Sequence, residues 1–151
     1  PAYKGIGLVT LTAAALAEHH DLNYPFAYNR KEEKDHGEGG ASVGAKIFGK
    51  VLILDDVITA GTAVREAIKI ITSEGGIPAG VLVALDREEV GTHSQVSAVQ
   101  ELAAQVNIPV RSIASLTDLV NHLKGDAVFA EHLPAMLSYR DRYGAGLDKN
   151  N

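Results

Sequence analysis

The chain has 151 residues, of which 46% are hydrophobic and 22% charged, as expected for a globular protein with one buried core. Its longest apolar run, Gly5–Ala17, is shorter than the roughly 20 residues of a membrane span. The 19 acidic and 14 basic residues give a net charge of −5, which argues against general nucleic-acid binding. The chain has no cysteine, which excludes a disulfide framework, a thiolate metal site and a cysteine nucleophile.

Helix-like and strand-like stretches alternate along the chain, which predicts an α/β fold with a central, mostly parallel sheet flanked by helices. Residues 6–20 have the apolar spacing of a well-buried helix, carried by Ile6, Val9, Ala13 and Leu16. Residues 26–29 are predicted to form a short strand. Residues 30–44 are charged and rich in glycine, so we expect a long mobile loop there.

The middle of the chain predicts two central strands with a helix between them. Residues 51–54 form a branched apolar run, typical of a parallel strand covered on both faces. An apolar helical stripe follows and ends at Gly75 and Gly76; it consists of Val64, Ala67, Ile68 and Ile71. Residues 81–85 predict the second central strand, which ends in Asp86 and Arg87.

The last third predicts three helices and one strand. The first helix covers residues 96–106, and a strand covers residues 109–114. Ser115 and Asp118 resemble a capping box at the start of a helix that ends at Gly125. A final helix is expected from Pro134 to just before Gly144. We expect the tail, residues 145–151, to be disordered.

The strongest functional signal is the segment 51–62, Val-Leu-Ile-Leu-Asp-Asp-Val-Ile-Thr-Ala-Gly-Thr. In open α/β sheets, ligands bind beyond the carboxyl ends of the strands, where Asp55 and Asp56 are expected to lie. The turn Thr59–Thr62 leads into a helix and offers hydroxyls and free backbone N–H groups to a phosphate. Carboxylates for sugar hydroxyls beside a phosphate site predict a ribose-phosphate ligand. In the alternative interpretation, Asp56 only caps a turn and Gly61 only permits tight packing.

This segment resembles the signature of the type I phosphoribosyltransferases, which use phosphoribosyl pyrophosphate and magnesium. Residues 30–40, Arg-Lys-Glu-Glu-Lys-Asp-His-Gly-Glu-Gly-Gly, resemble the mobile catalytic loop of the orotate phosphoribosyltransferase family in particular. Residues 1–5, Pro-Ala-Tyr-Lys-Gly, resemble its pyrophosphate-binding loop, and Arg87 matches the family's arginine after the next strand. The resemblance implies the Rossmann-like type I phosphoribosyltransferase fold.

The proposed catalytic loop has the chemistry that its task requires. Four potential cations fall within seven positions, namely Arg30, Lys31, Lys34 and His36. Such a cluster suits a pyrophosphate leaving group, whose negative charge grows as the glycosidic bond breaks. A loop closing over the substrates would also exclude water. The alternative is a solvated charged loop without a role.

The resemblance also implies a role for individual residues. The catalytic residues would be Lys34, His36, Asp55 and Asp56. Orotate would be bound by Thr59 and Arg87. Phosphoribosyl pyrophosphate would be bound by Tyr3, Lys4, Arg30, Lys31, Lys34, His36, Asp55, Asp56, Val57, Ile58, Thr59, Ala60, Gly61, Thr62 and Ala63. Mg²⁺ would arrive with phosphoribosyl pyrophosphate, near Asp55 and Asp56, without a direct protein ligand.

The family resemblance implies a cytoplasmic homodimer that transfers ribose 5-phosphate to orotate in pyrimidine synthesis. The catalytic loop would be shared across subunits, and no nucleic-acid or membrane partner is expected. Family members carry a hood segment and a first core strand before the pyrophosphate loop, so we expect residues 1–151 to be a single, N-terminally truncated domain. Three alternatives stay open at this point: a purine phosphoribosyltransferase, a nucleotide-sensing regulatory protein on the same fold, and an inactive fragment of a phosphoribosyltransferase.

Overall fold

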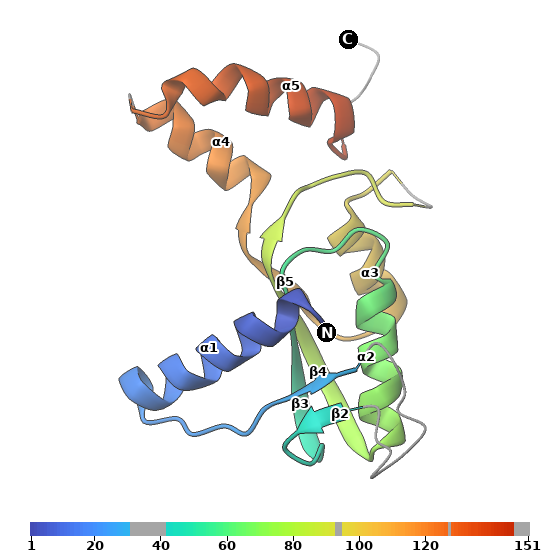
Figure 1. Ribbon diagram of the computed structural model, residues 1–151. Helices are drawn as coiled ribbons and strands as arrows, with labels where there is room; N and C mark the ends of the chain where they lie inside the picture. Colours follow the sequence, from blue (N-terminus) through green and yellow to red (C-terminus); the bar gives the residue numbers. More distant parts are fainter. Residues whose placement is uncertain (31–41, 93–94, 127, 147–151) are drawn as a thin grey trace. The chain divides into compact units, whose positions relative to one another are not determined.

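The structure is a computed structural model that describes residues 1–30, 42–92, 95–126 and 128–146 (Figure 1). These residues group into two compact units. Unit 1 comprises Pro1–Asp56 and Thr62–Val81, and unit 2 comprises Val57–Gly61 and Leu82–Asn151. Within the described ranges, every helix is too short or too polar to cross a membrane.

Unit 1 begins with α1 (Lys4–His20) and continues with β1 (Ala27–Asn29), β2 (Ser42–Gly44), β3 (Gly49–Asp55) and α2 (Thr62–Ser73). β1 and β2 pair antiparallel, with Tyr28 opposite Val43. β4 (Gly76–Asp86) starts in unit 1 and ends in unit 2. The core of unit 1 is built from buried aliphatic side chains, namely Ile53, Val64, Ile71 and Val81.

Unit 2 continues with α3 (Ala98–Val106), β5 (Val110–Ser115) and α4 (Leu116–Gly125). A short 3₁₀ helix, η1 (Ala130–His132), then leads into α5 (Leu133–Tyr143). The predicted capping box of α4 is confirmed, because Ser115 Oγ accepts a hydrogen bond from Asp118 N and the Asp118 carboxylate accepts one from Ser115 N. The core of unit 2 is again aliphatic and consists of Val83, Leu102, Val110, Leu116 and Val120.

The central sheet has the strand order β3-β4-β5 and is parallel. A helix follows each of these three strands in the chain, as the sequence pattern predicts for an α/β protein (Figure 1). The α/β prediction is therefore confirmed.

Two predictions of burial in unit 1 are wrong. Gly5 is the one fully buried residue of α1, and the predicted apolar stripe of this helix is only half-buried. β3 is not covered on both faces, because Leu52 is 56% exposed whereas Ile53 is 4% exposed. The physical reason is common to both elements. Leu52, Val9 and Leu16 line an open pocket instead of packing beneath another layer.

Two predicted boundaries also need correction. Ser42–Gly44, expected in the loop, form β2, while residues 31–41 lie outside the described residues. Val96 lies before α3, because Ser97 caps that helix. In the predicted tail, Ala145 N donates to Glu88 O at 2.7 Å, and residues 147–151 lie outside the described range, so the expected disorder of the tail stays a prediction.

Candidate active site

The two predicted carboxylates lie at the carboxyl end of β3, in unit 1. Asp55 is only 9% exposed, and its Oδ1 accepts a hydrogen bond from Asp56 N at 2.9 Å. Burial raises the pKa of the Asp55 carboxyl above its usual 3.8. The Asp56 side chain is 29% exposed and pairs with Lys4, whose Nζ lies 2.9 Å from Oδ2. The site thus contains one sheltered and one accessible carboxylate.

A close approach of α1 to β3 brings Lys4 to Asp56. A Cβ on Gly5 would lie 3.1 Å from Leu54 O and 3.3 Å from Pro1 Cδ, so a larger residue would crowd this junction. The segment before the helix is also fixed, because Ala2 N donates to Asn29 Oδ1 of β1 at 2.7 Å. The predicted pyrophosphate-binding residues therefore occupy the start of α1. Tyr3, the N-cap residue, is 66% exposed there.

The loop Val57–Gly61 follows Asp56 directly in the chain and contains most of the predicted phosphate-binding turn, Thr59–Thr62, which leads into α2. Ile58 is 5% exposed and anchors the loop in unit 2, while Thr59 and Ala60 are exposed. Gly61 is buried and has a φ of 70°, a conformation that strongly favours glycine. The loop thus presents Thr59 and Ala60 to solvent and buries the Ile58 side chain. That arrangement suits close approach of a phosphate to the backbone.

Arg87, the residue after β4, contacts this loop within unit 2. Its Nη2 donates to Thr59 Oγ1 at 3.0 Å. The same nitrogen lies 2.8 Å from Glu89 Oε2, and the Arg87 side chain is 32% exposed. The two residues predicted to bind orotate are therefore in direct contact. The positive charge of this guanidinium can attract a carboxylate and donate a charge-assisted hydrogen bond to it.

Not every predicted residue can be placed. Arg30 is exposed at the end of the first described range, and Lys31, Lys34 and His36 lie outside the described residues. Conversely, sequence reasoning missed Glu89 as a partner of Arg87. The acidic pair that follows Arg87 was a possible signal, but the spacing alone does not indicate which carboxylate turns back onto the guanidinium.

The described residues contain no cluster of three His, Asp or Glu side chains that could hold a metal ion by themselves. Asp55 and Asp56 place carboxylate oxygens, hard and negatively charged, near the expected Mg²⁺ position, and Mg²⁺ commonly keeps several waters and binds substrate phosphates. These two residues therefore fit a magnesium ion that is held mainly by a phosphorylated substrate.

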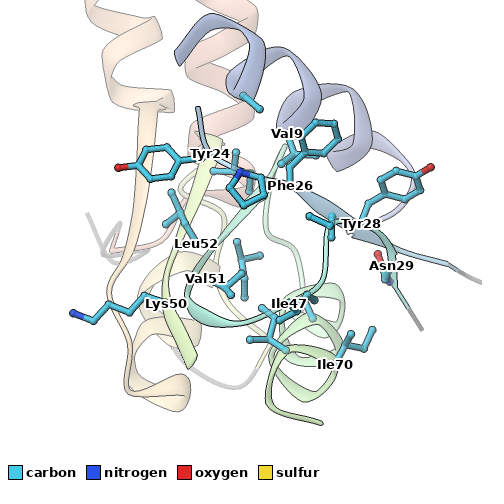
Figure 2. A pocket seen from close by; sticks show the side chains of 18 of the residues that line it. Val9, Tyr24, Phe26, Tyr28, Asn29, Ile47, Lys50, Val51, Leu52 and Ile70 are labelled. Atoms are coloured by element: carbon cyan, nitrogen blue, oxygen red, sulfur yellow. The ribbon is translucent and has the colours of Figure 1, made fainter. Parts of the chain in front are cut away.

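A separate apolar pocket of about 580 Å³ lies in unit 1 between α1, β3 and α2 (Figure 2). Aromatic and aliphatic side chains such as Val9, Phe26 and Leu52 gather around it, whereas the amino group of Lys50 points away. Neither Asp55 nor Asp56 lines it. An apolar pocket of this kind does not suit a highly charged sugar phosphate, so it is not the candidate site.

Comparison with individual curated proteins identifies the family of this chain, although no general family model matches it. The curated orotate phosphoribosyltransferase of Shigella dysenteriae serotype 1 is 54% identical over 144 residues, which are 95% of this chain and 67% of that protein. The chain belongs to the orotate phosphoribosyltransferase family. An orotate phosphoribosyltransferase of Escherichia coli O139:H28 matches with the same identity and coverage.

A solved structure supports the assignment of fold. The crystal structure of orotate phosphoribosyltransferase from Francisella tularensis matches with a TM-score of 0.76 and 34% identity, over 96% of this chain and 68% of that one. The predicted type I phosphoribosyltransferase fold is thus confirmed. Members of the orotate phosphoribosyltransferase family are glycosyltransferases of pyrimidine biosynthesis.

Proposed function

We propose that this chain transfers ribose 5-phosphate from phosphoribosyl pyrophosphate to orotate, forming orotidine 5′-monophosphate and pyrophosphate. The contact between Arg87 Nη2 and Thr59 Oγ1 supports this proposal independently of family membership. It joins a group suited to the carboxylate of orotate with a hydroxyl of the loop suited to a ribose phosphate. A site that binds a carboxylate at one end and a ribose phosphate at the other matches orotidine 5′-monophosphate, which carries both groups.

The phosphoribosyl end of the ligand would be held by residues of three segments. Thr59–Ala63 would bind the 5′-phosphate. Asp55 and Asp56 would bind the ribose hydroxyls, and Tyr3 and Lys4, at the start of α1, would bind the pyrophosphate. Arg30, Lys31, Lys34 and His36 would add positive charge to the pyrophosphate. The Lys4–Asp56 ion pair supports this assignment, because it places a cation beside a proposed ribose ligand.

In the proposed reaction, a ring nitrogen of orotate attacks C1 of the ribose as the bond from C1 to pyrophosphate breaks. Positive charge develops on the ribose, and negative charge develops on the leaving group. Asp55 and Asp56 would stabilise the first charge, and Lys34 and His36 the second. The nucleophile belongs to the substrate, so no nucleophilic side chain is needed.

Magnesium would enter with phosphoribosyl pyrophosphate, beside Asp55 and Asp56. It would neutralise part of the charge of the pyrophosphate group. The protein's own contribution is to orient the ribose through these two carboxylates.

We further infer a cytoplasmic homodimer in which the catalytic loop of one subunit reaches the site of the other. The support is membership of the orotate phosphoribosyltransferase family. Light scattering of the purified protein tests the dimer. Mixing a variant altered in the catalytic loop with one altered at Arg87 tests the shared loop, because hybrid dimers would regain activity at one site.

The function itself is tested by offering orotate, adenine and xanthine separately, each with phosphoribosyl pyrophosphate and magnesium. We expect nucleotide formation with orotate and none with the purine bases. Turnover of a purine base without orotate turnover would indicate a purine phosphoribosyltransferase. Salt-dependent binding of RNA or DNA without any turnover would indicate a regulatory protein.

A further inference from the structure

The guanidinium of Arg87 is held in place by a carboxylate. Glu89 Oε2 lies 2.8 Å from Arg87 Nη2, and the two side chains are only 21% and 32% exposed. A partly desolvated, charge-assisted hydrogen bond of this kind is stronger than an exposed ion pair. Nη2 contacts both Glu89 Oε2 and Thr59 Oγ1. Glu89 therefore restricts the direction in which the rest of the guanidinium points.

Glu89 is in turn held by the last helix of unit 2. The Tyr139 hydroxyl of α5 donates a hydrogen bond to Glu89 Oε1, the carboxylate oxygen that does not face Arg87. This hydrogen bond raises the pKa of the Tyr139 hydroxyl above its usual value. Tyr139 and Glu89 are separated by 50 positions in the chain. A continuous hydrogen-bonded series thus runs from Tyr139 through Glu89 and Arg87 to Thr59.

The backbone around Arg87 is fixed independently of this series. Asp86 Oδ1 accepts from Glu88 N at 2.8 Å, and the Glu88 carboxylate accepts from Thr117 Oγ1 at 2.7 Å. Val90 N also donates to Tyr143 O at 2.9 Å. Removal of the Tyr139 hydroxyl should therefore leave the backbone in place and free only the Glu89 and Arg87 side chains.

We propose that Glu89 and Tyr139 are positioning residues for the orotate carboxylate. Glu89 orients the guanidinium of Arg87, and Tyr139 orients Glu89, so that α5 contributes to substrate binding without touching the substrate. The proposal rests on the proposed function, in which Arg87 binds orotate.

The test compares two hydroxyl deletions on one helix. Tyr139→Phe removes the donor to Glu89, and Tyr143→Phe makes the same chemical change on the neighbouring ring, 5.0 Å away. We expect Tyr139→Phe to raise the KM for orotate about tenfold, the effect of one lost charge-assisted hydrogen bond. The KM for phosphoribosyl pyrophosphate and kcat should change less than about twofold, and Tyr143→Phe should leave all three unchanged. Equal effects of the two variants on the KM for orotate would overturn the proposal.

A double-mutant cycle separates positioning from general stability. Glu89→Gln should raise the KM for orotate when Arg87 is present and have no further effect in an Arg87→Ala background. Equal effects in both backgrounds would mean that Glu89 acts without Arg87 and would overturn the proposal. If the unaltered protein forms no orotidine 5′-monophosphate, the proposed function itself fails. If Arg87→Ala alone raises the KM for orotate, the function stands and the positioning role fails.

Discussion

Lys4 Nζ lies 2.9 Å from Asp56 Oδ2, so an ion pair joins the first turn of α1 to the end of β3. The Lys4 side chain is 76% exposed. Ion pairs this accessible to water contribute at most about 1 kcal/mol to stability. The pair therefore matters more for the charge that it places at the site than for the free energy of unfolding.

Replacing Lys4 should affect binding more than folding. Lys4→Ala is expected to raise the KM for phosphoribosyl pyrophosphate about tenfold, because a charged hydrogen bond to the substrate is lost. The melting temperature should change by less than about 4 °C. Lys69→Ala, at an exposed position of α2, is the control and should leave the KM unchanged. A large drop in melting temperature with an unchanged KM would assign Lys4 a structural role.

Gly5 and Gly7 form a matched pair on α1. A Cβ at Gly5 would press on Leu54 O at 3.1 Å, whereas a Cβ at Gly7 would meet nothing within 4 Å. Gly7→Ala should stabilise the protein by up to about 1 kcal/mol through helix propensity. Gly5→Ala should shift the start of α1 away from β3 and raise the KM for phosphoribosyl pyrophosphate several-fold. Steady-state kinetics and urea unfolding of both variants check this, and equal KM values would show that the close approach is not needed.

Asp55 should destabilise the protein when it is ionised. Burial raises its pKa in the folded protein above 3.8, so the neutral carboxyl favours folding. That contribution is complete below the unfolded-state pKa and is lost as the pH rises through the folded-state pKa. Asp55→Asn should therefore be more stable than the unaltered protein at about pH 7 and lose this advantage near pH 3, while turnover falls sharply. Urea unfolding at both pH values measures the effect. Asp141→Asn, at an exposed position of α5, should show no such difference.

Lys34 is predicted to act on the transition state. Lys34→Ala should lower kcat by at least about 100-fold, with little change in the dissociation constant of phosphoribosyl pyrophosphate, because charge on the leaving group grows as the bond breaks. Single-turnover kinetics and equilibrium binding separate the two quantities. Undiminished catalysis by this variant would remove the loop from the mechanism.

The order of the helices and strands could be predicted from local sequence signals, mainly apolar spacing and helix-capping residues. Apolar spacing predicted α1 to within two residues of its start, and Ser115 with Asp118 predicted the start of α4. The start of α3 was placed too early, although Ser97 and Gln100 form a capping box that a local search could have found. β2 was missed because a three-residue strand that ends in glycine carries almost no pattern.

Features that depend on distant partners could not be predicted from the sequence. The exposure of Leu52 depends on what covers its face of β3, and strand composition does not reveal this. The acidic pair and the phosphate loop form one continuous motif, so they could be predicted. The contact of Tyr139 with Glu89 spans 50 positions and has no local signature.

The most direct test of the central claim is the orotate dependence of orotidine 5′-monophosphate formation by Arg87→Ala, compared with the unaltered protein. Loss of this charge-assisted contact should raise the KM for orotate by roughly tenfold to 100-fold and change the KM for phosphoribosyl pyrophosphate by less than about threefold. An equal rise of both KM values, or no change in either, would contradict the account.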